Sequence, residues 1–365
     1  MNTLPLHVQH QAIGATFQTH GDWEIPSHYG NPQSEYEALH TNAGLADLSL
    51  RGNVIVTGDD RITWLQSIIS QDILPLQPGQ GRYSTFMDHK GKMLSYFRVF
   101  IRPEQVVIED VGEVGEQTYA AFRKFLLYGT KAKMGKGIES QGLLLLSGPK
   151  AVEILKEALG VEVENLASLQ SMSFSFEGAH GFITRTEETG MDDYELFAPL
   201  EVLVPLWTHL LKTGEPAGLK PIGKAILETA RIEAGLPRLG PDINERIVPP
   251  EANLEGIAFS LTKGCYPGQE VVARMDTYGS VKRRLVGLVI EGTEKDLPEA
   301  GAKLFSGTRE VGWVSSSTFS LLLQKPIALG FPLRDFTLPA TQLEVEIQDK
   351  KFSASVSDLP FTPLT

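Results

Sequence analysis

The segment 263–270, KGCYPGQE, combines the residue types of a reactive loop. Cys265 is the only cysteine of the 365-residue chain, and a thiolate is the form of cysteine that attacks electrophiles or binds metals. Residues 266–269 (YPGQ) fit a type II turn, with proline second and glycine third. A helix is predicted over 269–275, which places Cys265 before a helix N-terminus, where the helix dipole and Lys263 favour the thiolate. A lone cysteine is most often a small buried apolar residue. The polar neighbours of Cys265 favour a functional thiol instead.

The chain from 235 to 268 is rich in glycine, proline and asparagine, which predicts a long ordered loop leading to this motif. Such loops inside compact domains are often functional. The helix predicted over 224–234 ends at Gly235, which suits a helix C-terminus because glycine readily adopts a left-handed conformation.

Up to Arg284, the apolar periodicity predicts a mixture of helices and strands. Strands are predicted over 53–57, 83–87, 93–101, 142–147, 174–185 and 194–198. Helices are predicted over 34–41, 58–69, 113–127, 150–159 and 200–213, and residues 1–33 are predicted to be irregular. The strands 83–87 and 93–101 form a hairpin across the turn 88–91. Asp59 or Asp60 is expected to cap the helix that follows them.

After Arg284 the pattern consists of short strands separated by glycine and proline turns. The strands are predicted over 285–290, 303–305, 310–316, 327–331 and 342–347. This tail is therefore expected to form a small β-barrel or sandwich domain.

Composition and charge limit the classes of function. With 42% hydrophobic and 21% charged residues, the chain is typical of a globular protein of two or three domains. Its net charge of −12 repels phosphate, so we expect no nucleic-acid partner. A single cysteine excludes an internal disulfide. The absence of a signal-peptide pattern or long apolar run predicts a cytoplasmic protein without a membrane partner.

The eight histidines are scattered and show no metal-ligand spacing. We therefore expect no metal site, and no iron–sulfur cluster held by one chain, because one cysteine cannot ligate a cluster alone. A cluster held transiently between Cys265 and a partner's ligands remains open.

Several motifs resemble those of one protein family. KGCYPGQE, followed by Ala273-Arg274 and the basic residues 282–284, resembles the signature of the YgfZ family. Four further segments resemble those shared with glycine-cleavage aminomethyltransferases: 43–49 (AGLADLS), 56–60 (VTGDD), 231–237 (RIEAGLP) and 240–245 (GPDINE). Nearly the whole chain is thus similar to the YgfZ-type folate-binding proteins, relatives of the aminomethyltransferase that support iron–sulfur enzymes.

The resemblance implies an α+β fold of the aminomethyltransferase type, a three-lobed ring in which folate binds the central hole. Residues 1–284 would form two interleaved α+β lobes, and residues 285–365 the C-terminal β-barrel. It also implies tetrahydrofolate as the cofactor, and folate together with iron–sulfur proteins or assembly factors as partners.

The resemblance implies roles for individual residues. Glu195 aligns with a glutamate that binds the pterin ring, and a carboxylate can accept two parallel N–H bonds from the ring's amino-pyrimidine edge. The alternative for Glu195 is a solvated strand glutamate. Arg231, Lys263 and Arg274 are assigned to the anionic folate, and Cys265 is assigned as the reactive group. The cluster 282–284 either binds folate carboxylates or forms a solubilising patch at a domain boundary.

One departure from the aminomethyltransferases affects the predicted activity. Their second hairpin strand carries an Asp-Asp pair, one member of which acts in catalysis, and here Ser95-Tyr96 replaces it. Neither replacement supplies a carboxylate, which argues against ordinary aminomethyl transfer. The first hypothesis is a tetrahydrofolate-binding accessory protein for iron–sulfur cluster assembly or repair. The alternatives are a folate-dependent one-carbon transferase or demethylase, and a scaffold that folate only stabilises.

Overall fold

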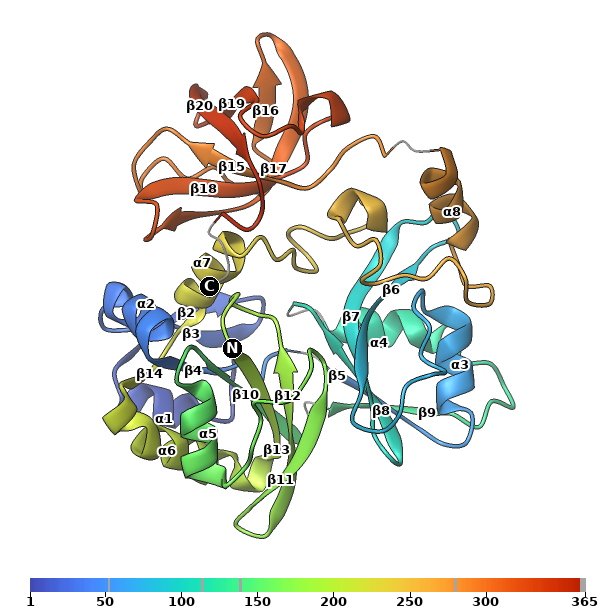
Figure 1. Ribbon diagram of the computed structural model, residues 1–365, viewed down its shortest axis with the longest axis vertical. Coiled ribbons are helices and arrows are strands. Elements are labelled where there is room, and N and C mark those ends of the chain that lie inside the picture. Colours follow the sequence, from blue (N-terminus) through green and yellow to red (C-terminus); the bar gives the residue numbers. More distant parts are fainter. Residues whose placement is uncertain (52, 113–114, 138–139, 279–280, 362–365) are drawn as a thin grey trace. The chain divides into compact units, whose positions relative to one another are not determined.

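The computed structural model describes residues 1–51, 53–112, 115–137, 140–278 and 281–361 (Figure 1). The chain divides into two compact units that alternate along the sequence. Unit 1 contains residues 1–52 and 137–230, and unit 2 contains residues 53–136 and 231–365. The mixed α and β content and the closed C-terminal barrel confirm the predicted α+β class and the predicted barrel.

Unit 1 is built on two sheets. The smaller sheet has the order β1-β3-β2 and consists of β1 (Asn2–Thr3), β2 (Ala15–His20) and β3 (Trp23–Tyr29). The larger sheet has the order β11-β12-β13-β10-β4-β14. Its strands are β4 (Ala43–Asp47), β10 (Gln141–Ser147), β11 (Ser171–Phe176), β12 (Ala179–Thr186), β13 (Asp193–Pro199) and β14 (Leu219–Pro221).

Unit 1 contains both α-helices and a 3-10 helix. They are α1 (His7–Ala12), α2 (Pro32–Thr41), α5 (Ala151–Leu159), α6 (Leu200–Gly214) and the 3-10 helix η2 (Glu215–Ala217). Asn31 caps α2, with its side chain accepting from the Gln33 N–H at 3.0 Å. Ile154 of α5 and Trp207 of α6 share a core with Leu196 of β13. This core fixes one face of β13 and leaves its other face for polar side chains.

The first part of unit 2 is a sheet in the order β6-β7-β8-β5-β9. Its strands are β5 (Asn53–Thr57), β6 (Gly81–Met87), β7 (Met93–Ile101), β8 (Gln105–Asp110) and β9 (Lys133–Lys136). The helices α3 (Arg61–Ile68) and α4 (Gly115–Arg123) pack on it. Phe122 of α4 contacts Trp64 of α3 and also Phe86 and Phe97 of the sheet.

The second part of unit 2 is the long loop and the barrel. Helix α7 (Lys224–Glu233) leads into the loop, which contains the 3-10 helix η3 (Pro249–Ala252) and ends at α8 (Gln269–Tyr278). The closed barrel has the order β15-β18-β17-β16-β19-β20. Its elements are β15 (Val286–Ile290), β16 (Lys303–Ser306), β17 (Arg309–Ser320), β18 (Lys325–Gly330), η4 (Arg334–Phe336), β19 (Gln342–Ile347) and β20 (Lys350–Ser357).

Most predicted elements are confirmed, including the hairpin β6–β7 and the helix end at Gly235, whose φ is +72°. Several predictions were wrong. The N-terminal segment contains α1, β2 and β3, the run 174–185 is split between the hairpin strands β11 and β12, and α4 ends at Arg123. Residues 113–114 of the predicted helix 113–127 lie outside the described residues. Asp60 stands at the N-cap of α3 without capping it, because its carboxylate accepts from Lys131 N–H.

In the described ranges, no helix is long and apolar enough to cross a membrane.

Candidate functional site

Glu195 lies in the middle of β13, on the sheet face opposite α5 and α6. Its neighbours Tyr194 and Leu196 belong to the helix-covered core, and side chains alternate between faces along a strand. The Glu195 side chain is 0% exposed. It is therefore a buried acid on the sheet face opposite these helices, and the solvated-strand alternative does not hold.

A buried arginine contacts the Glu195 carboxylate. Arg51 Nη1 donates to Glu195 Oε1 at 2.8 Å. The same guanidinium forms a two-point bond with Glu188, with Nη1–Oε1 at 3.0 Å and Nη2–Oε2 at 2.7 Å. Arg51 follows β4 in a turn fastened to β10 by Ser49, whose hydroxyl accepts from the Leu143 N–H at 3.1 Å. The Arg51 cation therefore lies between two carboxylates that are 137 and 144 positions away from it in the sequence.

Asp193 organises the turn that presents Glu188. One carboxylate oxygen accepts from the N–H groups of Glu188 and Thr189, at 2.7 and 2.9 Å, and the other accepts from the Thr189 hydroxyl at 2.8 Å. Burial raises the pKa of Asp193 to about 6, and these hydrogen bonds oppose the rise. The order of the turn thus depends on a buried carboxyl group beside the Arg51 cluster.

The positions of the missing acidic pair lie in β7, and both side chains are buried. Ser95 faces α4, where its hydroxyl donates to Asp110 at 3.1 Å and also bonds Thr118. Tyr96 lies on the other face of the sheet, stacked on Tyr83 with ring centroids 5.7 Å apart. The Asp110 carboxylate is thus on the helix-covered face, while the opposite face presents an aromatic pair at this position.

The Cys265 loop has a defined backbone. The predicted type II turn is confirmed, because Gln269 N–H donates to the Tyr266 carbonyl at 3.3 Å and Gly268 has φ of +81°. The Tyr266 hydroxyl donates to the Ser260 carbonyl at 2.7 Å. Cys265 itself is exposed, which excludes the buried apolar alternative.

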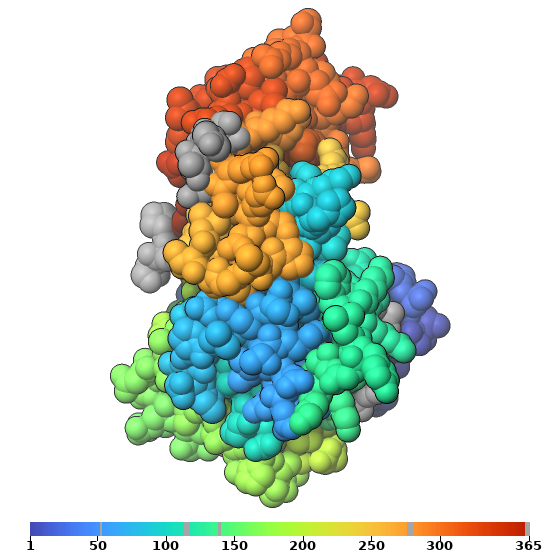
Figure 2. All heavy atoms as spheres, turned by 90° about the vertical axis from the view of Figure 1, so that its right-hand side faces the viewer, coloured from blue at the N-terminus to red at the C-terminus, as the bar shows by residue number. Residues whose placement is uncertain are grey.

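The Lys263 ammonium points away from solvent toward the end of α3. Its Nζ donates to the carbonyls of Gln66, Ile69 and Gln71 at 2.6, 2.7 and 3.1 Å. Burial lowers the pKa of Lys263 to about 8, and nearby Asp72 opposes this shift. Figure 2 shows the consequence on the surface, where the orange segment of the cysteine loop lies directly against blue α3. Lys263 therefore fastens the loop to the helix.

The two assigned arginines differ in burial. Arg231 is buried and donates to Asp242 Oδ2 at 2.8 Å and to the Ser316 hydroxyl at 2.7 Å. Arg274 is exposed on α8 and pairs with Glu270 one turn earlier. Arg231 thus joins the long loop to the barrel, whereas Arg274 lies on the surface.

The basic cluster 282–284 surrounds the start of the barrel. Arg283 stacks on Trp313 at 4.7 Å and donates to the carbonyl of Val311 at 3.1 Å. Arg284 donates to Asn253 at 2.6 Å and to Glu255 at 3.0 Å. These contacts favour a structural role at the domain boundary over an open anion site.

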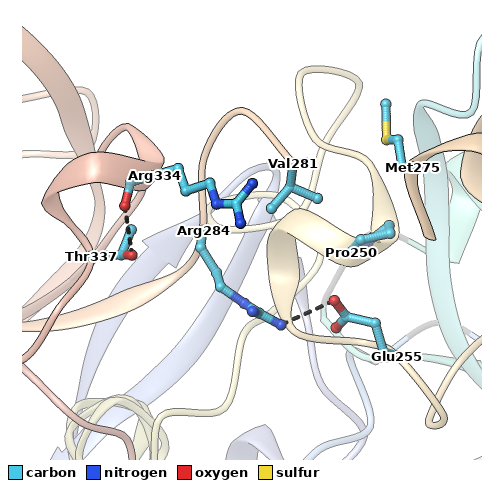
Figure 3. A pocket seen from close by; sticks show the side chains of 7 residues that line it. All are labelled: Pro250, Glu255, Met275, Val281, Arg284, Arg334 and Thr337. Carbon is cyan, nitrogen blue, oxygen red and sulfur yellow. Dashed lines mark hydrogen bonds and ion pairs between the residues drawn. The ribbon is translucent and has the colours of Figure 1, made fainter. Parts of the chain in front are cut away.

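A pocket of about 250 Å³ lies beside Arg284 in unit 2 (Figure 3). It is lined by Pro250, Glu255, Met275, Val281, Arg284, Arg334 and Thr337. Figure 3 shows Arg284 directed at Glu255 across the pocket, so part of its charge is neutralised there.

Among the residues that the structure describes, no three His, Cys, Asp or Glu side chains form a group that could hold a metal ion. Sequence reasoning missed Arg51, Glu188 and Asp110. Glu188 and Asp110 belong to acidic stretches that resemble ordinary surface residues, and their partners lie in other strands. Arg51 carries no local signal either, because its partners lie 137 and 144 positions later in the sequence.

The two units that alternate along the sequence and the closed C-terminal barrel match the aminomethyltransferase fold. A model of the GCVT N-terminal domain matches residues 6–263, and a model of the glycine cleavage T-protein C-terminal barrel domain matches residues 283–362. The chain therefore belongs to the glycine cleavage T-protein (GCVT) family.

Individual relatives match along their full lengths. An aminomethyltransferase of Geobacillus sp. (strain WCH70) is 30% identical, covering 99% of this chain and 98% of its own. An aminomethyltransferase of Chlorobium luteolum is also 30% identical, and the match covers 99% of this chain and 98% of that protein. The crystal structure of the glycine cleavage system aminomethyltransferase T from Bartonella henselae matches with a TM-score of 0.88 at 26% identity, covering 99% of this chain and 98% of that one.

Proposed function

We propose that this protein is a tetrahydrofolate-binding accessory protein of the YgfZ type, which supports the assembly or repair of iron–sulfur clusters in enzymes. Glu195 would recognise the pterin ring, and Cys265 would be the chemically active group. Arg274, exposed on α8, is a candidate to meet the carboxylates of the folate tail.

The observation that carries the proposal is the setting of Cys265. An exposed thiol is held in a loop whose turn, lysine anchor and tyrosine hydrogen bond fix its backbone. A cysteine kept only for packing has no need of such a presentation. Iron–sulfur proteins or assembly factors are the partners that an accessible thiol can serve, through metal contact or thiol exchange.

The replacement of the acidic pair supports an accessory role over ordinary aminomethyl transfer. Ser95 is bonded into a polar cluster under α4, and Tyr96 is stacked on Tyr83. Neither side chain can stabilise a positive charge that develops on the folate as a carboxylate does.

Cellular complementation tests the role of Cys265. Cells that lack the native protein are given the wild-type chain or Cys265→Ser, and the activity of iron–sulfur enzymes is measured at matched protein levels. We expect the wild type to restore activity and the variant, which removes the thiol with little change in volume, to fail. Full restoration by Cys265→Ser would show that the thiol is not the active group.

Calorimetric titration with tetrahydrofolate tests the ligand. We expect saturable binding that Glu195→Ala weakens by about 1–3 kcal/mol, the range for losing a charge-assisted hydrogen bond. Glu187→Ala is the matched control, because Glu187 is an exposed acid beside the same hairpin turn and should leave affinity unchanged. Absence of binding by the wild type would contradict the tetrahydrofolate proposal and favour a role as a scaffold for protein partners.

A second candidate is a folate-dependent one-carbon transferase or demethylase, favoured by the 30% identity to aminomethyltransferases over the whole chain. It predicts that the pure protein transfers the methylene carbon of an aminomethyl-type donor, which is already at the formaldehyde oxidation level, to tetrahydrofolate, giving methylene-tetrahydrofolate and the released amine. Absence of turnover across a panel of such donors would count against it.

A further inference from the structure

Arg51 is the buried cation between Glu188 and Glu195. The side chains of Arg51, Glu188 and Glu195 are 6%, 13% and 0% exposed. Both terminal nitrogens of the guanidinium fork donate to Glu188, and Nη1 also donates to Glu195. The fork is thus anchored on Glu188 while it contacts the Glu195 carboxylate.

The geometry has an electrostatic consequence for Glu195. A carboxyl group without exposure to water favours its neutral form unless a cation or hydrogen-bond donors stabilise the charge. Arg51 supplies that cation at 2.8 Å, because a guanidinium stays protonated at any ordinary pH. A charged carboxylate can accept two parallel N–H bonds, whereas a protonated one presents a hydroxyl that clashes with a second donor.

The anchor itself is rigid. Glu188 lies in the turn between β12 and β13, which Asp193 holds through two backbone N–H groups and the Thr189 hydroxyl. The Ser147 hydroxyl of β10 bonds the Thr189 hydroxyl at 2.8 Å, which ties the turn to the same sheet that carries Glu195. The turn that carries Glu188 is therefore tied to the interior strands β10 and β13, and it fixes the position of the Arg51 fork.

We propose that Arg51 is a positioning residue for an aminopyrimidine ligand, held by Glu188 so that it keeps the Glu195 carboxylate charged and oriented. The inference rests on the proposed function, because it takes Glu195 as the pterin contact. Recognition of the ligand then requires Glu188, Arg51 and Glu195 together, and the ligand must offer adjacent N–H donors to the Glu195 carboxylate. Arg51 contacts the carboxylate and not the ligand.

The test is the pH dependence of tetrahydrofolate affinity, measured anaerobically by calorimetry for the wild type, Arg51→Met and Arg51→Lys. We expect a nearly flat wild-type profile from about pH 7 to about pH 9, because the cation keeps Glu195 ionised throughout and Asp193, with a pKa of about 6, stays ionised over this range. Arg51→Met should bind about tenfold or more weakly near pH 7 and recover as the pH rises, because Glu195 then ionises only at higher pH. Arg51→Lys should restore the flat profile, since it keeps the charge but lacks the fork.

The outcomes separate the inference from the proposed function. If the wild type binds no tetrahydrofolate, the proposed ligand fails and the inference falls with it. If the wild type binds and Arg51→Met shows the same affinity and the same flat profile, the inference alone is overturned. Tighter binding by Arg51→Met would also overturn it, because Arg51 would then compete with the ligand for Glu195. Thermal denaturation checks folding of each variant, and Arg51→Gln repeats the neutral case if Arg51→Met is unfolded.

Discussion

Lys263 and Arg274 are both cations close to Cys265, yet they use their charges differently. Lys263 donates to three carbonyls at the end of α3, which a helix leaves without intrahelical partners. Arg274 forms an exposed pair with Glu270 on α8. The sequence predicted both residues as folate contacts from residue type and resemblance. The structure buries the Lys263 side chain and leaves Arg274 exposed.

We predict that Lys263→Met destabilises the protein. Three buried carbonyls would lose their donor, and hydrogen bonds to a charged group contribute about 1.5–3 kcal/mol. Arg274→Ala should change stability by less than about 0.5 kcal/mol, because exposed ion pairs contribute little. Thermal denaturation of the two variants beside the wild type compares them. Equal melting temperatures for Lys263→Met and the wild type would contradict a structural role for the lysine.

At the scale of elements, the cysteine loop depends on one glycine and tolerates change at another. Gly268 has φ of +81°, and a Cβ there would lie 2.7 Å from the Asp88 carbonyl oxygen and 2.9 Å from Gly91 Cα. Gly264 has no heavy atom within 4 Å of the corresponding Cβ position. The type II turn thus touches the β6–β7 hairpin through Gly268.

We predict that Gly268→Ala costs about 1–3 kcal/mol, the range for backbone held in an unfavourable region. The hairpin must also move to admit the methyl group, so the reaction of Cys265 with a thiol reagent should change rate. Gly264→Ala is the matched control in the same loop and should leave both quantities near the wild-type values. If Gly264→Ala changed the stability and the Cys265 reaction rate more than Gly268→Ala did, the type II turn would not determine the conformation of the loop.

The elements that the sequence predicted are those with local signals, such as the YPGQ turn and the strands of the barrel. The hairpin β11–β12 was predicted as one run because its turn, Glu177-Gly178, lacks the usual asparagine or aspartate before glycine, although both residues have positive φ. Helix α4 was predicted too long because Phe125 and Leu126 continue its periodicity. Their N–H groups bond three residues back, and Trp64 takes the Phe125 carbonyl at 3.0 Å.

The sequence predicted only those residues of the candidate site that belong to a recognisable motif. Glu195 was assigned by resemblance, and its burial depends on the neighbouring strands. Arg51 could not be assigned, because its pairing with Glu195 spans 144 positions of sequence. Such a contact depends on strand order, which local patterns do not encode.

At the scale of the whole molecule, unit 2 is held together by a core that includes sheet, loop and barrel. Met93 of β7, Ile243 of the loop and Leu329 of β18 belong to one buried cluster. A polar network accompanies it, in which Arg231 bonds Asp242 and Ser316, and Asp242 Oδ1 accepts from the hydroxyl of Ser316 at 2.7 Å. The barrel is therefore joined to the loop by packing and by the hydrogen bonds of Ser316 to the buried Arg231–Asp242 ion pair.

We predict that Arg231→Met lowers the free energy of unfolding by about 3–5 kcal/mol, because it leaves the buried Asp242 carboxylate without its cation. The double variant Arg231→Met/Asp242→Asn should recover part of this loss, since the amide is neutral and still accepts from Ser316. Chemical denaturation gives the stabilities, and hydrogen exchange reports whether β17, which carries Ser316, opens first in the single variant. Additive losses in the double variant, or unchanged exchange in β17, would contradict the view that this ion pair secures the barrel to the loop.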